Sequence, residues 1–355
     1  MRTITGSIRA RRLRRGLTIT EVAVAAAAVA ALGAATIPVF RKVGCSAMRA
    51  QSAAQLSTIA AAHAAYAADH ADRQFTLCPD DLGLWQGNWG PYQAANGCVD
   101  PVVLGTTGDG NTVTVGPGCG SNTSGGAFLV PATLSSGGNA LQFGSYRLTN
   151  AQPMNQYVGG RFLDQTFYAP DDLGVSRKLQ RHIDDGRDFE FVDDYETSYD
   201  YSIAAMFDPA VMGGGSPNNP VFQDPRFAAN GYGFRSPTNA QCVHPSLKTR
   251  FLERHAMDNS PGQNRSYSGP QPYHWNEVYR GRSLALFFDG SVRNFSPSEA
   301  MKSEARLGGS KLWLRTTPLG SGGFAGYHAA DFLVDTSVHY LTAGGILGRD
   351  TIAAD

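Results

Sequence analysis

A single carboxylate interrupts an apolar stretch near the start of the chain, and its chemistry sets the first constraint on the molecule. Glu21 is the only charged residue from Leu17 to Phe40, and six arginines but no acidic residue precede Gly16. An ionised side chain at the centre of a bilayer costs about 2.5–3.5 kcal/mol, so it usually pairs with an opposite charge. We therefore predict that Glu21 has a cationic partner, which this stretch does not itself supply.

The apolar stretch determines where such a pair would lie. A run of roughly 20 apolar residues spans a bilayer as a helix, and a basic flank stays on the cytoplasmic side. The run is rich in alanine, which forms helix well but contributes little burial energy. We predict a basic leader over 1–16, a transmembrane or filament-core half-helix over 17–40, an amphipathic half-helix over 41–70 and a globular head over 71–355.

The second half of this helix carries one apolar stripe. Leu56, Ile59, His63, Tyr66 and His70 recur at intervals of three and four residues, which is the spacing of one helix face. The stripe predicts that the helix packs against the head, with the two histidines as packing residues rather than ligands.

The N-terminal pattern resembles that of type IV prepilins and pseudopilins. Gly16, Leu17, Thr18 and Glu21 match the family motif in order, and Pro38 stands where many pilins carry a helix-kinking proline. The resemblance implies that a prepilin peptidase cleaves between Gly16 and Leu17 and that the new amine of Leu17 is methylated. It also implies that Glu21 meets the Leu17 ammonium of a neighbouring subunit, a pairing that offsets the desolvation of both charges.

For the whole chain, the resemblance implies a structural subunit of a type IV pilus or a type II secretion-type pseudopilus, and not an enzyme. Its partners would be the prepilin peptidase, other pilin or pseudopilin subunits, and the inner-membrane platform with its ATPase. The precursor would be a single-pass protein of the cytoplasmic membrane with its head exported. The alternative is an ordinary signal peptide cleaved near Ala35, which would release a soluble enzyme or carbohydrate-binding protein that begins near Thr36.

The overall charge argues against one class of partner. The chain has 30 basic and 30 acidic residues, and because six arginines lie in the leader, the remainder keeps 24 basic residues and a net charge of about −6. A mildly acidic body gives no reason to expect nucleic-acid binding.

The cysteines fit an exported head, where disulfides can form. Four of them lie in the head, namely Cys78, Cys98, Cys119 and Cys242. They allow three pairings, of which loop closure favours Cys78–Cys98. Cys45, in the helical stretch, is left over.

The head carries a hairpin signal near its C-terminal end. Two apolar runs flank Asp289-Gly290, a pair typical of a type I′ turn, in which both central residues have positive φ. The Asp-Gly-Ser-Val sequence also resembles the C-terminal hairpin of a large group of bacterial prepilin-like proteins, although Tyr279 stands where those proteins carry a histidine. Ser296–Arg306 is typical of a short helix.

The predicted fold class is α+β. A long N-terminal α-helix, whose first half spans the membrane, packs on a globular head with an antiparallel β-sheet. The run from Tyr195 to Tyr201 is strand material, and residues 209–239 are rich in glycine, proline and asparagine, as in a long surface loop. Trp85, Trp89 and Tyr92 are predicted to fill the core, and the alternative is an exposed aromatic patch that binds sugars or partners.

Two sets of residues could carry chemistry in the head, and neither forms a recognisable motif. Carboxylates crowd residues 161–201, and calcium prefers such ligands. Their spacing fits no calcium loop, so we predict a solvated acidic face and no cofactor, with a calcium site as the alternative. Glu253, His255, His274 and Glu277 lie close in sequence without the spacing of a metal or hydrolytic site. We therefore predict no catalytic residue. The acidic set comprises Asp171, Asp172, Asp184, Asp185, Asp188, Glu190, Asp193, Asp194 and Glu196.

Overall fold

The computed structural model describes residues 46–118, 129–132, 144–170, 172–190, 197–253, 283–295, 297–314, 316–317, 320–321 and 339–352. The chain divides into two compact units, Met1–Ala47 and Met48–Asp355. Nearly all of the described residues belong to the second unit.

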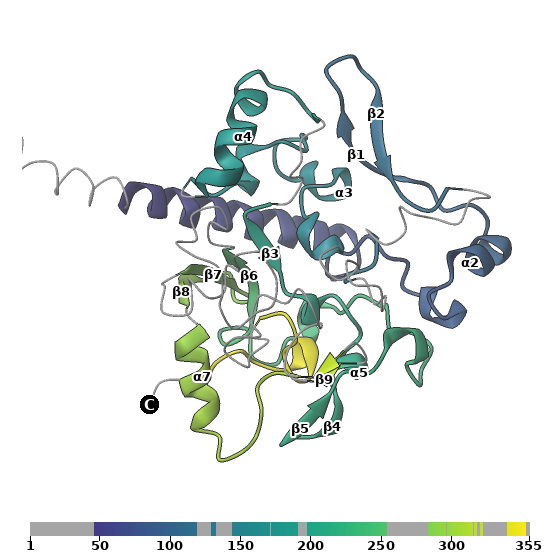
Figure 1. Cartoon of the computed structure of the whole chain (residues 1–355), viewed down its shortest axis with the longest axis vertical. Helices are drawn as coiled ribbons and strands as arrows, with labels where there is room; N and C mark the ends of the chain where they lie inside the picture. The colour runs from purple at the N-terminus through teal and green to yellow at the C-terminus, as the bar shows by residue number, and fades with distance from the viewer. Residues whose placement is uncertain are drawn as a thin grey trace, which may run out of the picture. The chain divides into compact units, whose positions relative to one another are not determined.

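A helix over residues 46–69, purple in Figure 1, crosses the second unit between α4 (Leu173–Asp184) and the strands β3 (Tyr199–Tyr201) and β6 (Thr249–Glu253) in this view. Its 24 residues extend over roughly 36 Å at 1.5 Å per residue. Leu56, Ile59, His63 and Tyr66 are at most 8% exposed, which confirms the predicted stripe. His70 lies past the helix end and is exposed, and its ring stacks on the Tyr66 ring with 3.8 Å between the centroids.

The main sheet has four antiparallel strands in the order β3-β6-β7-β8. These strands are β3 Tyr199–Tyr201, β6 Thr249–Glu253, β7 Ser283–Phe287 and β8 Val292–Phe295. Every residue of β3, β6 and β7 is buried, so these strands are covered on both faces. The register between β6 and β7 shifts between Thr249 and Phe251, around Arg250, as it does at a β-bulge.

β7 and β8 form the predicted hairpin around Asp289-Gly290. The Gly290 N–H donates to Phe287 O at 3.0 Å, and the Phe287 N–H donates to Ser291 O at 2.9 Å. Gly290 has a φ of 82°, whereas Asp289 is not among the residues with positive φ. This is the pattern of a type I turn followed by a glycine bulge, so the hairpin is confirmed and the predicted type I′ turn is wrong.

The helix packs against β3 and β6 through aromatic and polar contacts. The Tyr199 hydroxyl donates to Gln55 Oε1 at 2.6 Å. The His63 ring lies 5.2 Å from the Tyr201 ring and 4.9 Å from the Phe251 ring, measured between centroids. Figure 1 shows β3 beside the helix, and the core sits between these two elements.

Shorter elements complete the unit. The other α-helices described are α2 Trp89–Asn96, α3 Gln152–Asn155, α4 Leu173–Asp184, α5 Pro209–Met212 and α7 Pro297–Ala305. The small antiparallel pairs are β1 Val102–Thr106 with β2 Thr112–Val115, β4 Gly214–Ser216 with β5 Asn219–Val221, and β9 Thr316–Thr317 with β10 Gly320–Ser321. The 3₁₀ turns are η1 Leu82–Trp85, η4 Ser145–Arg147, η5 Gln165–Phe167, η6 Ile203–Ala205, η7 Pro225–Phe227, η8 Asn239–Gln241 and η12 Gly345–Leu347.

Two local predictions met different outcomes in this part of the chain. α7 confirms the short helix predicted over Ser296–Arg306. The segment 209–239, predicted as a surface loop, instead forms α5 and the β4–β5 pair and buries Phe222 and Phe234.

The fold-class prediction needs one correction. The second unit is α+β, but no helix in the part of the chain that the structure describes has both the length and the apolarity to cross a bilayer. The helix over 46–69 is long enough, yet its outer face is polar, with residues such as Gln51, Ser57 and Thr58. The membrane-spanning prediction is therefore wrong for the fold described, and its residues 17–40 lie outside the described ranges.

Candidate functional site: a buried lysine–aspartate network

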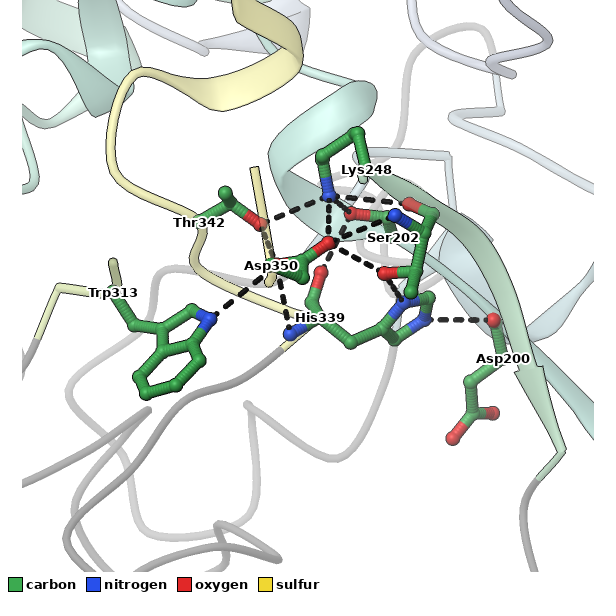
Figure 2. Close-up of polar contacts among 8 residues, drawn as sticks. Asp200, Ser202, Lys248, Trp313, His339, Thr342 and Asp350 are labelled. Carbon is green, nitrogen blue, oxygen red and sulfur yellow. Dashed lines mark hydrogen bonds and ion pairs between the residues drawn. The ribbon is translucent and has the colours of Figure 1, made fainter. Parts of the chain in front are cut away.

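Asp350 lies at the centre of a buried polar network, shown in Figure 2. The network joins segments that are far apart in sequence. Its members are Asp200 and Ser202 at the end of β3, Lys248 and Thr249 at the start of β6, Trp313, and His339, Thr342 and Asp350 in the C-terminal stretch.

Lys248 and Thr249 contact one carboxylate oxygen of Asp350. Oδ2 accepts from Lys248 Nζ at 3.0 Å, and from the Thr249 backbone N–H and hydroxyl at 2.9 and 2.6 Å. Burial alone would raise the pKa of Asp350, but the Lys248 ammonium and the hydroxyls of Thr249 and Thr342 outweigh burial and lower this pKa to about 2. Asp350 is therefore held as a carboxylate.

The other carboxylate oxygen of Asp350 binds the C-terminal stretch and the neighbouring segment. Oδ1 accepts from the Thr342 hydroxyl at 2.6 Å, and from Trp313 Nε1 and the His339 backbone N–H at 3.3 Å each. A carboxylate offers about four acceptor positions, and these donors fill them.

Lys248 is equally well supplied with acceptors. Besides Asp350, its Nζ donates to Ser202 Oγ at 2.8 Å, to Thr342 Oγ1 at 2.9 Å and to the Thr249 carbonyl at 3.1 Å. An ammonium has three N–H groups, so the ion pair lies in a saturated shell. Good geometry and complete hydrogen bonding are the conditions under which a buried pair offsets its desolvation.

His339 bridges the network to β3. Its Nδ1 lies 2.8 Å from Thr249 Oγ1, and its Nε2 lies 2.9 Å from the Asp200 carbonyl oxygen. If both ring nitrogens carried a proton, Nδ1 would donate to Thr249 Oγ1 and the Thr249 hydroxyl could donate to Asp350. Burial and the nearby Lys248, however, lower the pKa of His339 to about 3. The ring is therefore neutral, Nε2 carries its proton, and the single Thr249 proton serves either Asp350 or Nδ1 at one time.

The burial of this network decides what it can do. All eight side chains are at most 2% exposed, so no substrate reaches them. A lysine held in an ion pair is not a nucleophile, and a carboxylate with a pKa of about 2 is a poor base near neutral pH. The network fastens the C-terminal stretch to β6 and β3, which is a structural task.

A second and sparser polar cluster lies between the helix and the sheet. Arg250 Nη2 donates to Gln74 Oε1 at 2.9 Å, and the Tyr201 hydroxyl donates to the same oxygen at 2.6 Å. Arg250 also lies 5.1 Å from the centroid of the Phe288 ring, but its Nε has no hydrogen-bond partner among the described residues. The two ring nitrogens of His63 also have no hydrogen-bond partner among the described residues. Burial and the nearby Arg250 lower the pKa of His63 well below its usual value.

The predicted processing and assembly residues are not part of either cluster. Gly16, Leu17, Thr18, Glu21 and Pro38 lie outside the described residues, and their roles stay predictions.

The residues considered for catalysis or for a metal have structural partners where they are described. The Leu284 N–H donates to Glu253 Oε2 at 3.0 Å. Asp172 accepts from Ser198 Oγ at 2.7 Å, and Asp188 accepts from the Thr106 N–H at 2.7 Å, so these two carboxylates do not form the predicted solvated face. No group of three or more His, Cys, Asp or Glu in the described ranges could hold a metal ion. Outside the described ranges lie the other residues of these two sets, namely His255, His274, Glu277, Asp171, Asp193, Asp194 and Glu196.

The states of the cysteines contradict the disulfide pairing that loop closure favoured. Cys78 and Cys242 are free thiols, whereas Cys98 is disulfide-bonded, so the predicted Cys78–Cys98 bond is wrong. Burial raises the pKa of the Cys78 thiol well above its usual value, which makes this thiol unreactive. Cys45 and Cys119 lie outside the described residues.

The aromatic cluster is mostly in the core, as predicted. Trp89 and Tyr92 are buried, and their ring centroids lie 6.1 Å apart. Trp85 is half-buried beside the exposed Leu84.

Sequence reasoning missed the whole Asp350 network. Lys248 and Asp350 are 102 residues apart, and neither belongs to a spaced motif. A lysine next to a strand and an aspartate in a glycine-rich stretch are both ordinary surface features in a sequence.

Comparisons with protein-family models, curated proteins and solved structures found no match to this chain.

Proposed function

We propose that this chain is a prepilin-like structural subunit that a prepilin peptidase processes and that assembles into a type IV pilus or a type II secretion-type pseudopilus. The motif Gly16-Leu17-Thr18 with Glu21 is the sequence basis of the proposal. The structural observation that carries it is the helix over 46–69, because Leu56 and Ile59 on this helix are at most 1% exposed. The globular body thus packs on the helix over 46–69, which follows the assembly motif in the sequence.

Two further observations support a structural and exported role. The polar network around Asp350 is buried away from solvent and fastens chain segments together. Cys98 is disulfide-bonded, and disulfides persist mainly outside the reducing cytosol. The partners under this proposal are the peptidase, sibling subunits and the inner-membrane platform with its ATPase.

The mature N-terminus tests the proposal. We expect mass spectrometry of the exported protein to find a chain that starts at a methylated Leu17. The Gly16→Ala variant should accumulate as the longer precursor, because the peptidase reads the residue before the cleaved bond. A mature chain that begins near Thr36 would replace the proposal by a signal peptide and a released protein.

Glu21 separates an assembling subunit from a protein that is only processed. The Glu21→Ala variant should be cleaved like the wild type and yet fail to enter filaments, because the Leu17 ammonium of the next subunit then lacks its counter-charge. Normal incorporation of this variant, measured by immunoblotting of sheared filaments, would contradict the assembly role.

A further inference from the structure

A cavity with a cationic lining opens between β8, the end of α7 and the C-terminal stretch. Its volume is about 490 Å³, and its polar lining residues are Arg293, Asn294, Lys302, Ser303, Arg306 and Thr351. We call it the cationic cleft. None of the described residues that line it is acidic. Lys302 and Arg306 are exposed, so their charges face solvent.

The cleft is held in shape by contacts that leave its charges available. Arg293 lies with its guanidinium 3.7 Å from the centroid of the Phe287 ring and donates to the Ser246 carbonyl. Glu304, two residues from Lys302, is buried and accepts from the Leu312 N–H at 2.9 Å. That carboxylate also lies 3.9 Å from Lys311. It is therefore committed to a neighbouring segment.

An acidic stretch of the chain lies elsewhere in the same unit. Residues 69–118, which we call the acidic lobe, contain six aspartates and one arginine. The arginine, Arg73, lies 3.8 Å from Asp80, and the exposed carboxylates include Asp69, Asp100 and Asp109. The lobe therefore carries an excess of negative charge at neutral pH.

The helix over 46–69 relates the two surfaces. Arg49, near the start of this helix, donates to Asn294 in the cationic cleft, whereas the acidic lobe begins where the helix ends. Figure 1 shows β8 and α7 towards one end of the helix and α2 with β1–β2 towards the other. Arg49 and Asp69 are 20 residues apart on the helix, so positive charge near its start and negative charge at its end lie roughly 30 Å apart along the helix direction.

From this arrangement we propose that the cationic cleft of one copy binds the acidic lobe of a second copy, head to tail along the helix direction. The two contacting surfaces are different, so the contact does not close on itself as a two-fold dimer and can repeat into a chain. Opposite potentials favour this orientation and oppose the head-to-head one, in which like charges meet. The inference rests on the proposed function only for its choice of a second copy as the occupant.

Charge reversal of each surface tests the contact in the full chain. Lys302→Glu with Arg306→Glu leaves the cleft lining with two acidic residues and one basic residue, and Asp69→Lys with Asp100→Lys and Asp109→Lys leaves the lobe with three acidic residues and four basic ones. We expect each variant alone to self-associate at least about tenfold more weakly than the wild type in sedimentation equilibrium. A mixture of the two should recover the association, because each reversed surface then meets a complementary one.

Salt and a matched variant separate this contact from other kinds of association. The wild-type association should weaken from about 0.1 M to about 1 M salt, over which the Debye length falls from roughly 10 to roughly 3 Å. Arg161→Glu with Arg181→Glu changes the net charge as the cleft variant does, at residues outside the cleft lining and outside residues 69–118, and it should associate like the wild type. Circular dichroism of each variant reports whether it folds.

Two outcomes would overturn the inference. One is a mixture that fails to recover association although both variants fold. The other is a wild-type chain that stays monomeric at low salt and binds inorganic phosphate in the cleft, which would make the cleft a small-anion site. Neither outcome depends on cleavage at Gly16, so an unprocessed N-terminus would refute the proposed function and leave this measurement intact.

Discussion

Lys248 and Arg250 lie two residues apart at the start of β6, and both are buried, yet their surroundings differ. Lys248 forms an ion pair with Asp350 and donates to three further oxygens. Arg250 has one amide acceptor, Gln74, and an aromatic ring beneath it. The hydrogen bonds of Lys248 are complete and join segments that are distant in sequence. The guanidinium of Arg250, beside an aromatic ring, has an N–H group without a hydrogen-bond partner among the described residues. Stability should therefore depend far more on the network at Lys248 than on the cluster at Arg250.

The two buried histidines repeat this contrast. Both ring nitrogens of His339 have partners, in Thr249 and Asp200, whereas those of His63 have none among the described residues. The pKa of each is lowered, chiefly by burial. A neutral ring is tolerated in both places, but only His339 contributes to a connected network.

Removing Asp350 should have the largest effect. In Asp350→Ala, Lys248 stays buried without a counter-charge, and breaking a buried pair in this way costs about 3–5 kcal/mol. Urea denaturation should show a midpoint well below that of the wild type. The double variant Lys248→Met with Asp350→Leu should recover much of the loss, because an apolar pair of similar volume needs no compensation. If Asp350→Ala unfolds at the wild-type urea concentration, the network does not fasten the C-terminal stretch.

A change on the helix should come next. Leu56 is fully buried against the sheet, and Leu→Ala in a core costs about 2–5 kcal/mol. Thr58 on the outer face is exposed, so Thr58→Ala is the matched control and should shift the urea midpoint little. Equal shifts for the two variants would mean that the helix does not pack as described.

The pH dependence of stability should show the contribution of His63. Its pKa is lowered in the folded state, and the unfolded value is about 6.5. Protons therefore bind the unfolded chain first, and stability falls as the pH drops from 7 to 5. Replacing His63 by Phe should remove a loss on the order of 2 kcal/mol over this range. The measurement is the difference in the free energy of unfolding between wild type and variant at each pH. A difference that does not change with pH would show that His63 is not buried as a neutral ring.

Arg250 should give the smallest effect. In Arg250→Met the Tyr201 hydroxyl still donates to Gln74, and a cation–π contact is worth roughly 0.5–2 kcal/mol. We expect a loss of no more than about 1 kcal/mol, since the desolvation of an incompletely paired guanidinium is also relieved. A loss as large as that of Asp350→Ala would remove the contrast between the two clusters.

Local features of this fold could be predicted from the sequence because they depend on short-range patterns. The stripe from Leu56 to Tyr66 has the period of one helix face, and Asp289-Gly290 marks a hairpin between two apolar runs. The turn type could not be predicted, because both common classes place glycine at positive φ and only the backbone of Asp289 distinguishes them.

Features that depend on long-range contacts could not be predicted. Residues 209–239 have a loop-like composition, yet Asp208 and Asp224 accept from the backbone N–H groups of Ala210 and Arg226 and start short helical turns. The Asp350 network needs the fold before its members meet, since a sequence assigns no distance between Lys248 and Asp350. The choice of disulfide failed for the same reason, because loop length alone does not say which thiols face one another.

The Lys248–Asp350 ion pair also determines an order of events during the synthesis and folding of the chain. β6 leaves the ribosome long before Asp350 does, and during that interval its lysine has no anion to neutralise it. The network is therefore incomplete until about a hundred further residues have been delivered. A chain interrupted anywhere in that interval would keep an unpaired lysine at the start of β6, which would mark it as a substrate for quality-control proteases rather than as a shorter working subunit.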